Sequence, residues 1–213
     1  MPRQLQPELL DSLPAAHPDA LRSRRDLRVI NALMGNHRWL VRTLAAVLRE
    51  GDRTLEIGAG TGELGRRLAA ADRPADGLDL AARPADWPAG CAWHSADLLT
   101  FAGYGGYDAV IGNLIFHHFT DDQLAALGRT LGASVRVIVA SEPTRSRFSQ
   151  RLFTLLTPLF GANHVTRHDA HVSIAAGFRD DELPRLLGLE PGQWRWQCHT
   201  SPLGAYRLVA IRP

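Results

Sequence analysis

Glycines and carboxylates in the first half of the chain have the types and spacing of a ligand-binding loop. Glu56 precedes Gly58, Gly60 and Gly62, and Asp79 stands at the end of the next expected strand. Glycine lets a backbone turn tightly and approach a ligand, and free N–H groups at a helix N-terminus bind polar groups. A carboxylate placed like Asp79 can accept hydrogen bonds from both hydroxyls of a ribose. The pattern predicts a ribose-containing cofactor and leaves a dinucleotide and a sulfonium compound both open.

Two adjacent histidines, His117 and His118, follow another expected strand. An imidazole with a pKa near 6.5 can accept the proton that a hydroxyl or an activated carbon must lose when it attacks an electrophile. Ligands of open parallel sheets bind at the carboxyl ends of the strands. We therefore expect one of the two histidines to act as a general base; the alternative is that the pair only shapes the pocket.

A second polar cluster lies between residues 163 and 173 and contains Arg167, His168 and His171. We expect these three side chains to contact substrate from a polar lid, with a solvated loop as the alternative. The histidine spacing could hold a metal ion. We nevertheless assign no metal ligand in this segment.

Alternating hydrophobic segments must position these residues. A βα rhythm of this kind favours an α/β fold with a mostly parallel sheet, and the last two strands read as an antiparallel hairpin. Strands are expected at 53–57, 75–80, 92–96, 107–114, 135–141, 193–200 and 205–212, and helices at 36–49, 64–70, 121–131 and 181–187.

Three departures from that rhythm define the domain organisation. Residues 1–35 read as a helical N-terminal arm before the main domain, 36–213. The link after the second strand contains Pro84 and Pro88 and is too short for the usual crossover helix. An insertion at about 143–180, with an apolar helix near 148–160, is expected to cover the substrate site.

Composition excludes several functions. The 213 residues are 45% hydrophobic and 22% charged, as in one globular domain. All 24 basic residues are arginine, which excludes Schiff-base and lysine general-base chemistry, and their even spread gives no reason to expect nucleic acid. Two distant cysteines imply no disulfide. No apolar stretch reaches the roughly 18 residues of a membrane span, so we expect a cytoplasmic protein without stable membrane insertion.

The complete motif set resembles the class I S-adenosylmethionine-dependent methyltransferases over roughly residues 36–213. The motifs are Glu56-Ile57-Gly58-Ala59-Gly60-Thr61-Gly62, then Asp79, then Ser95-Ala96-Asp97-Leu98-Leu99, then the segment 107–119 that ends in Phe116-His117-His118-Phe119. The resemblance implies a Rossmann-like, seven-stranded, mostly parallel sheet with an antiparallel last strand. It also implies S-adenosylmethionine as cofactor.

Site roles follow from the resemblance. It implies that the glycine loop holds the aminoacyl part of the cofactor, Asp79 the ribose, and Asp97 with Leu98 the adenine. Glu56, Leu80 and Asn113 complete the expected cofactor contacts. The implied function is methyl transfer to oxygen or carbon of a small-molecule acceptor, an aromatic or lipidic one of polyketide type. A non-catalytic cofactor- or partner-binding domain of the same fold and a nicotinamide-dependent oxidoreductase remain as alternatives, and the oligomeric state is open.

Overall fold

A seven-stranded sheet forms the centre of the molecule, which the computed structural model describes at residues 1–14 and 16–213. The strand order is β3-β2-β1-β4-β5-β7-β6. Neighbouring strands are parallel except where they pair with β7, which is antiparallel to β5 and β6. The predicted α/β fold with an antiparallel last strand is confirmed. The strands are β1 Thr54–Ile57, β2 Asp76–Asp79, β3 Trp93–Ser95, β4 Ala109–Asn113, β5 Val137–Pro143, β6 Arg195–Thr200 and β7 Ala205–Ile211.

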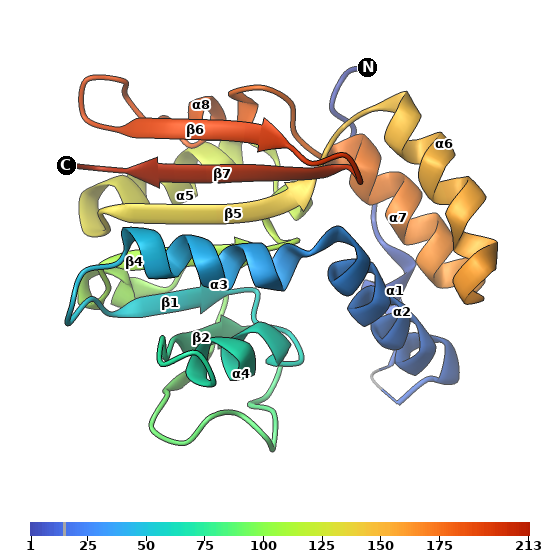
Figure 1. Ribbon diagram of the computed structural model, residues 1–213, viewed down its shortest axis with the longest axis horizontal. Helices are drawn as coiled ribbons and strands as arrows, with labels where there is room; N and C mark the ends of the chain where they lie inside the picture. Colours follow the sequence, from blue (N-terminus) through green and yellow to red (C-terminus); the bar gives the residue numbers. More distant parts are fainter. Residues whose placement is uncertain (15) are drawn as a thin grey trace.

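Helices cover both faces of the sheet (Figure 1). α3 (Asn36–Val47) and α4 (Glu63–Ala69) pack on one face, and α5 (Asp121–Ser134) and α8 (Glu182–Leu186) pack on the other. Alternate residues of a strand point to opposite faces. Val139 of β5 accordingly packs in the α3 and α4 cluster, whereas Ile138 packs in the α5 and α8 cluster. Two short 3₁₀ turns, Ala102–Gly106 and Phe116–His118, flank β4.

The link between β2 and β3 lacks a crossover helix, as its two prolines predict. Residues 80–92, all described, contain only turns and bends. Trp87 fills the space instead: it is 5% exposed, and its ring meets Trp93 edge-on with centroids 4.8 Å apart. Added Cβ atoms at Gly65 or Gly77 would collide with this indole. Trp87 is therefore a core side chain that replaces the missing helix.

A helical layer stands beyond the carboxyl ends of the strands and combines the N-terminal arm with the insertion (Figure 1). The arm forms α1 (Leu9–Ser12) and α2 (Pro18–Met34), and Gly35, with a φ of 66°, separates α2 from α3. The insertion forms α6 (Arg147–Leu156), a 3₁₀ turn η3 (Thr157–Phe160) and α7 (His164–Ala176). No helix in the described ranges is long and apolar enough to cross a membrane.

The alternative of a solvated loop at 163–173 was wrong, because α7 (His164–Ala176) occupies this segment. The side chain of Asn163 caps the helix by accepting a hydrogen bond from the Thr166 N–H at 2.9 Å. Val165 and Val172 are buried on its inner side. Polar residues outnumber these anchors, which hides the helical period in the sequence.

Two glycines of α5 give a test of how tightly the layers pack. Alanine normally stabilises a helix by about 1 kcal/mol relative to glycine. A Cβ at Gly128 would lie 1.9 Å from the carbonyl oxygen of Leu187, whereas a Cβ at Gly132 meets nothing within 4 Å. We expect Gly132→Ala to raise the free energy of unfolding by about 0.5–1 kcal/mol and Gly128→Ala to lower it by about 1–3 kcal/mol. Urea unfolding measures both, and equal effects would contradict the packing described.

Candidate active site

The glycine loop after β1 is open on one side. Gly58, Gly60 and Gly62 have φ values of 65°, 53° and 73°, a region that only glycine adopts readily. A Cβ at Gly58 would come within 2.6 Å of Ile115, but a Cβ at Gly60 would find no atom closer than 3.9 Å. The loop is thus closely packed at its start and has free space beside Gly60, where a ligand can approach the backbone.

Asp79 joins the end of β2 to this loop. One carboxylate oxygen accepts a hydrogen bond from the Gly60 N–H at 2.7 Å, and the other accepts one from the Ala81 N–H at 2.8 Å. Each carboxylate oxygen has a further lone pair, so Asp79 can still accept hydrogen bonds from a ligand. Leu80 follows with 78% of its surface exposed, an apolar side chain at the mouth of the loop.

Glu56 lies inside the protein beneath the loop. It is 3% exposed, and its Oε2 atom has no hydrogen-bond partner among the described residues. Burial and, to a smaller extent, the charge of Asp79 raise the pKa of Glu56 to about 8, against the opposing effects of the Gly65 N–H and Arg66. Glu56 is therefore largely protonated at neutral pH and supports the loop from within. Direct contact with a cofactor stays a prediction.

The segment after β3 carries the two predicted adenine contacts, of which one is exposed and the other is buried. Asp97 is exposed, and its carboxylate accepts a hydrogen bond from the Leu99 N–H at 2.9 Å. Leu98 is 7% exposed and packs in the core, while its carbonyl accepts a hydrogen bond from the Tyr104 hydroxyl at 2.8 Å. Only Asp97 of this predicted pair presents its side chain to solvent.

Asn113, at the end of β4, belongs to a buried amide cluster that sequence reasoning missed. Its Nδ2 donates to Asn31 Oδ1 at 3.1 Å, and Asn36 Nδ2 donates to the same oxygen at 3.0 Å. His37 Nε2 lies 3.5 Å from Asn113 Nδ2. The Oδ1 atoms of Asn36 and Asn113 are buried without a partner in the described part of the chain. Buried acceptors are normally satisfied, so these two oxygens suit a donor such as a ligand ammonium group.

Glu142, the penultimate residue of β5, fixes the histidine pair. This carboxylate is fully buried and accepts hydrogen bonds from the N–H groups of Ile115 and Phe116, both at 2.9 Å. His117 Nδ1 lies 2.6 Å from Glu142 Oε2, and His117 Nε2 lies 3.4 Å from Glu8 Oε1. Both ring nitrogens of His117 therefore face carboxylates.

The two histidines differ in charge. Burial lowers the pKa of His117, but the hydrogen bonds and charges of Glu142 and Glu8 outweigh it and raise the pKa to about 9. Burial and the positive charge of His117 lower the pKa of His118, despite the opposing charges of Glu8 and Asp11. His118 is neutral at pH 7 and its side chain is 29% exposed, against 4% for His117. Of the two predicted bases, the geometry favours His118.

Residues 1–12, here called the N-terminal strap, bring Glu8 and Asp11 to this place. Arg3 donates to the carbonyl oxygens of His117 and Phe119 at 3.2 and 2.7 Å. The backbone N–H groups of Leu9 and Leu10 donate to the carboxylate of Asp169 on α7. Nothing in the spacing of the strap residues points to a site, because the sheet edge that they meet is distant in the sequence.

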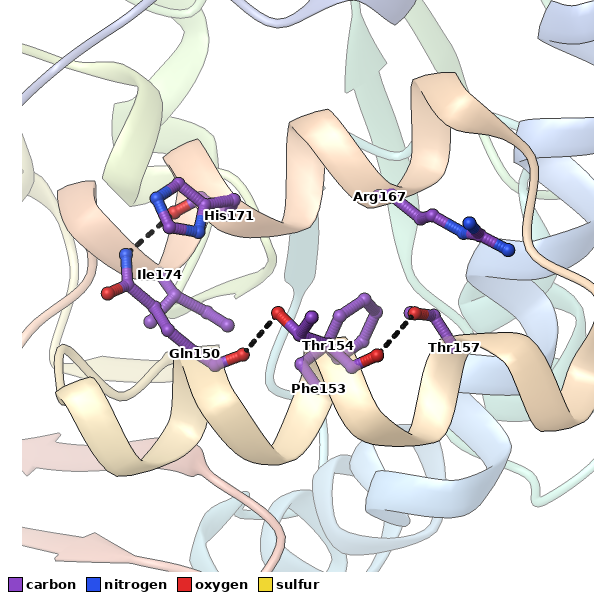
Figure 2. A pocket seen from close by; sticks show the side chains of 7 residues that line it. All are labelled: Gln150, Phe153, Thr154, Thr157, Arg167, His171 and Ile174. Carbon is purple, nitrogen blue, oxygen red and sulfur yellow. Dashed lines mark hydrogen bonds between the residues drawn. The ribbon is translucent and has the colours of Figure 1, made fainter.

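The predicted substrate trio is divided. Arg167 and His171 line a cavity of about 90 Å³ between α6 and α7 (Figure 2). His168 instead lies beside Asp169, with Nδ1 at 3.1 Å from Oδ1. The remaining lining residues are Gln150, Phe153, Thr154, Thr157 and Ile174. The trio does not form a single cluster, and contact of these residues with substrate stays a prediction.

Glu8, His117 and His118 could also hold a metal ion, since one ligand atom of each lies within 4.8 Å of the others. None of these three residues was expected to bind a metal. The contacts of His117 with two carboxylates are those of an ion pair, because the hydrogen bonds and charges of Glu142 and Glu8 outweigh the effect of burial and favour the protonated imidazole. We therefore interpret the cluster as an ion-pair network and not as a metal site.

Comparison with known proteins places the fold. No family model matches the chain. The structure is similar to the plantazolicin methyltransferase BamL in complex with a triazolic desmethylPZN analog and SAH, with a TM-score of 0.72 and 12% identity over 95% of this chain and 92% of that one. Magnesium protoporphyrin IX methyltransferase (ChlM) from Synechocystis PCC 6803 is similar with a TM-score of 0.58 and 18% identity, over 89% of this chain and 86% of that one. The pyocyanin biosynthetic protein PhzM is similar with a TM-score of 0.59 and 19% identity, over 93% of this chain and 60% of that one. The predicted methyltransferase fold is confirmed.

The raised pKa of His117 makes a prediction about stability. Protonated His117 stabilises the fold fully below pH 6.5, and this contribution is lost as pH rises through about 9, in total about 3 kcal/mol. We expect His117→Gln to cost about 3 kcal/mol more at pH 6 than at pH 9.5, measured by urea unfolding. The same replacement at the exposed His164 is the control. A cost that does not change with pH would contradict the charged state assigned to His117.

Proposed function

We propose that this protein transfers a methyl group from S-adenosylmethionine to a small-molecule acceptor. The observation that carries the proposal is a set of three features: the open glycine loop after β1, Asp79 bonded to it at the end of β2, and the buried amide oxygens of Asn113 at the end of β4 and Asn36 at the start of α3, which have no partner among the described residues. These groups fit a ligand with a ribose and an ammonium group. Similarity of fold to solved methyltransferases supports the same reading.

The residues divide along such a cofactor as follows. Asp79 would accept hydrogen bonds from the ribose, and the loop beside Gly60 with the amides of Asn36 and Asn113 would hold the aminoacyl end. Asp97 and the exposed Leu80 would meet the adenine. When bound, the cofactor supplies an electrophilic methyl group on a sulfonium.

The chain's own groups then prepare the acceptor. His118 is neutral and partly exposed, so it can accept the proton of an acceptor hydroxyl. His117 stays charged between Glu142 and Glu8, and its charge helps to keep His118 neutral. The N-terminal strap excludes water from this end of the sheet, which strengthens the electrostatic interactions of the site.

The acceptor class follows from the site and from relatives of the same fold. The similar proteins are a plantazolicin methyltransferase in complex with a triazolic desmethylPZN analog, a magnesium protoporphyrin IX methyltransferase and a pyocyanin biosynthetic protein, which favours a small-molecule acceptor. An aromatic or lipidic hydroxyl compound suits a base at His118 beside the apolar insertion. Both cysteines are unpaired, which is consistent with action in the reducing cytoplasm.

Cofactor binding tests the proposal most directly. We expect calorimetry to detect binding of S-adenosylhomocysteine and none of NADH. Asp79→Ala should weaken S-adenosylhomocysteine binding by about 1.5–3 kcal/mol, because it removes acceptors for the ribose hydroxyls. Glu190→Ala, an exposed acid before β6, should bind like the original chain. Preference for NADH would overturn the proposal in favour of an oxidoreductase.

Replacement of His118 tests the base. We expect His118→Gln to lower methyl transfer about 10²-fold with unchanged affinity for S-adenosylhomocysteine, because proton transfer contributes on that scale. Transfer from methyl-labelled cofactor to a panel of phenolic polyketides measures the rate, with His199→Gln on β6 as control. The rate of the original chain should fall on the acid side of a pKa below 6.5. Equal rates for His118→Gln and the control would assign the pair to pocket shape alone.

A further inference from the structure

The outer face of α6 is apolar and uncovered. No residue of α6 is buried, and this helix packs mainly on α7 and η3 along its inner side. Phe148, Leu152, Leu155 and Leu159 recur at helical spacing along one stripe, which continues from α6 into η3. Phe148, Leu155 and Leu159 are 68%, 73% and 80% exposed. Figure 1 shows α6 at the outer edge of the molecule, beyond α7.

The exposed charged side chains of α6 and α7 are positive. Between residues 144 and 178 the sequence contains a single acid, Asp169. Asp169 is buried and accepts hydrogen bonds from the N-terminal strap, so it does not neutralise the surface. Arg147 and Arg151 are exposed beside the apolar stripe, and Arg167 is exposed on α7. The α6 face is therefore apolar with a basic flank.

The same character continues onto the arm. Arg22 of α2 donates a hydrogen bond to the carbonyl oxygen of Gly161, just after η3, at 3.1 Å. Arg25 and Arg28 are exposed on the same helix, and Leu21 beside them is 56% exposed. The start of α2 therefore lies beside η3 and carries further exposed arginines, whereas Leu33 lies at the other end of this helix.

We propose that α6 docks this protein on an anionic lipid bilayer. Phe148, Leu155 and Leu159 enter the boundary between headgroups and acyl chains, and Arg147 and Arg151 meet the lipid phosphates. An amphipathic helix with a basic polar face binds membrane surfaces in this manner, without crossing the bilayer. The proposal does not rest on methyl transfer, because docking needs neither cofactor nor acceptor.

A second copy of the chain is the other occupant to consider. Symmetric pairing of two α6 helices would gather Arg147 and Arg151 of both copies around one interface. No exposed acid within residues 144–178 could balance these charges. Like charges at close range oppose association, whereas an anionic bilayer satisfies both the stripe and its flank.

Vesicle flotation tests the proposal with the full chain and no cofactor. We expect binding to vesicles of phosphatidylcholine mixed with phosphatidylglycerol, weak binding to phosphatidylcholine alone, and loss of binding as salt rises. The triple variant Phe148→Ser, Leu155→Ser, Leu159→Ser should bind at least about tenfold more weakly, because it removes the apolar contacts. Arg147→Gln with Arg151→Gln should remove most of the preference for phosphatidylglycerol.

Leu33→Ser is the matched control, since Leu33 is 57% exposed on α2 but lies outside the stripe. It should bind vesicles like the original chain. Far-ultraviolet circular dichroism and thermal melting show that each variant is folded, and because neither needs a cofactor they keep this test separate from the test of function. Absence of vesicle binding by the original chain, or equal binding by the triple variant, would overturn the proposal. A triple variant that changes only the mass measured by light scattering would assign the stripe to self-association.

Discussion

The buried carboxylate of Glu142 is the constraint on which the rest of the site depends. A charge in the core must be paired and hydrogen-bonded, and Glu142 meets this need with backbone N–H groups of the turn after β4 and with the imidazole of His117. The turn is thereby held against β5, His117 stays protonated, and its neighbour His118 stays neutral. The strap docks on the same turn through Arg3. One side chain on one strand thus sets a turn, two charge states and the seat of the N-terminal segment.

The sheet and the glycine loop were predictable because short stretches of the sequence determine both. Alternating hydrophobic runs gave the strands, and the glycines with Asp79 gave the loop and its partner. The difference between His117 and His118 was not predictable, since it arises from Glu142 on the neighbouring strand. A search for carboxylates at strand ends, the reasoning applied to Asp79, would have found Glu142. No such signal exists for Glu8, because only the folded path of the strap brings it to the sheet.

The arm is less separate than the sequence suggests. A boundary at Gly35 divides the chain in sequence, yet Asn31 lies on one side of it and Asn36 on the other, and both bond to each other next to Asn113. On α7 the buried Thr166 bonds to Asp26 of the arm at 2.9 Å. Burial of these amides and hydroxyls requires the arm, so residues that precede the predicted main domain complete both the amide cluster beside Asn113 and the packing of α7.

The N-terminal strap is attached differently from everything it covers. None of its twelve residues is buried, and hydrogen bonds and ion pairs hold it to α7 and to the turn after β4. Water can replace such contacts when they open, whereas the packed leucines and valines of the sheet have no comparable substitute. The strap can consequently detach from α7 and from the turn after β4 at a lower free-energy cost than a strand can leave the sheet. Detachment of the strap would expose more of His118, whose side chain is 29% exposed with the strap in place, while the sheet stays folded.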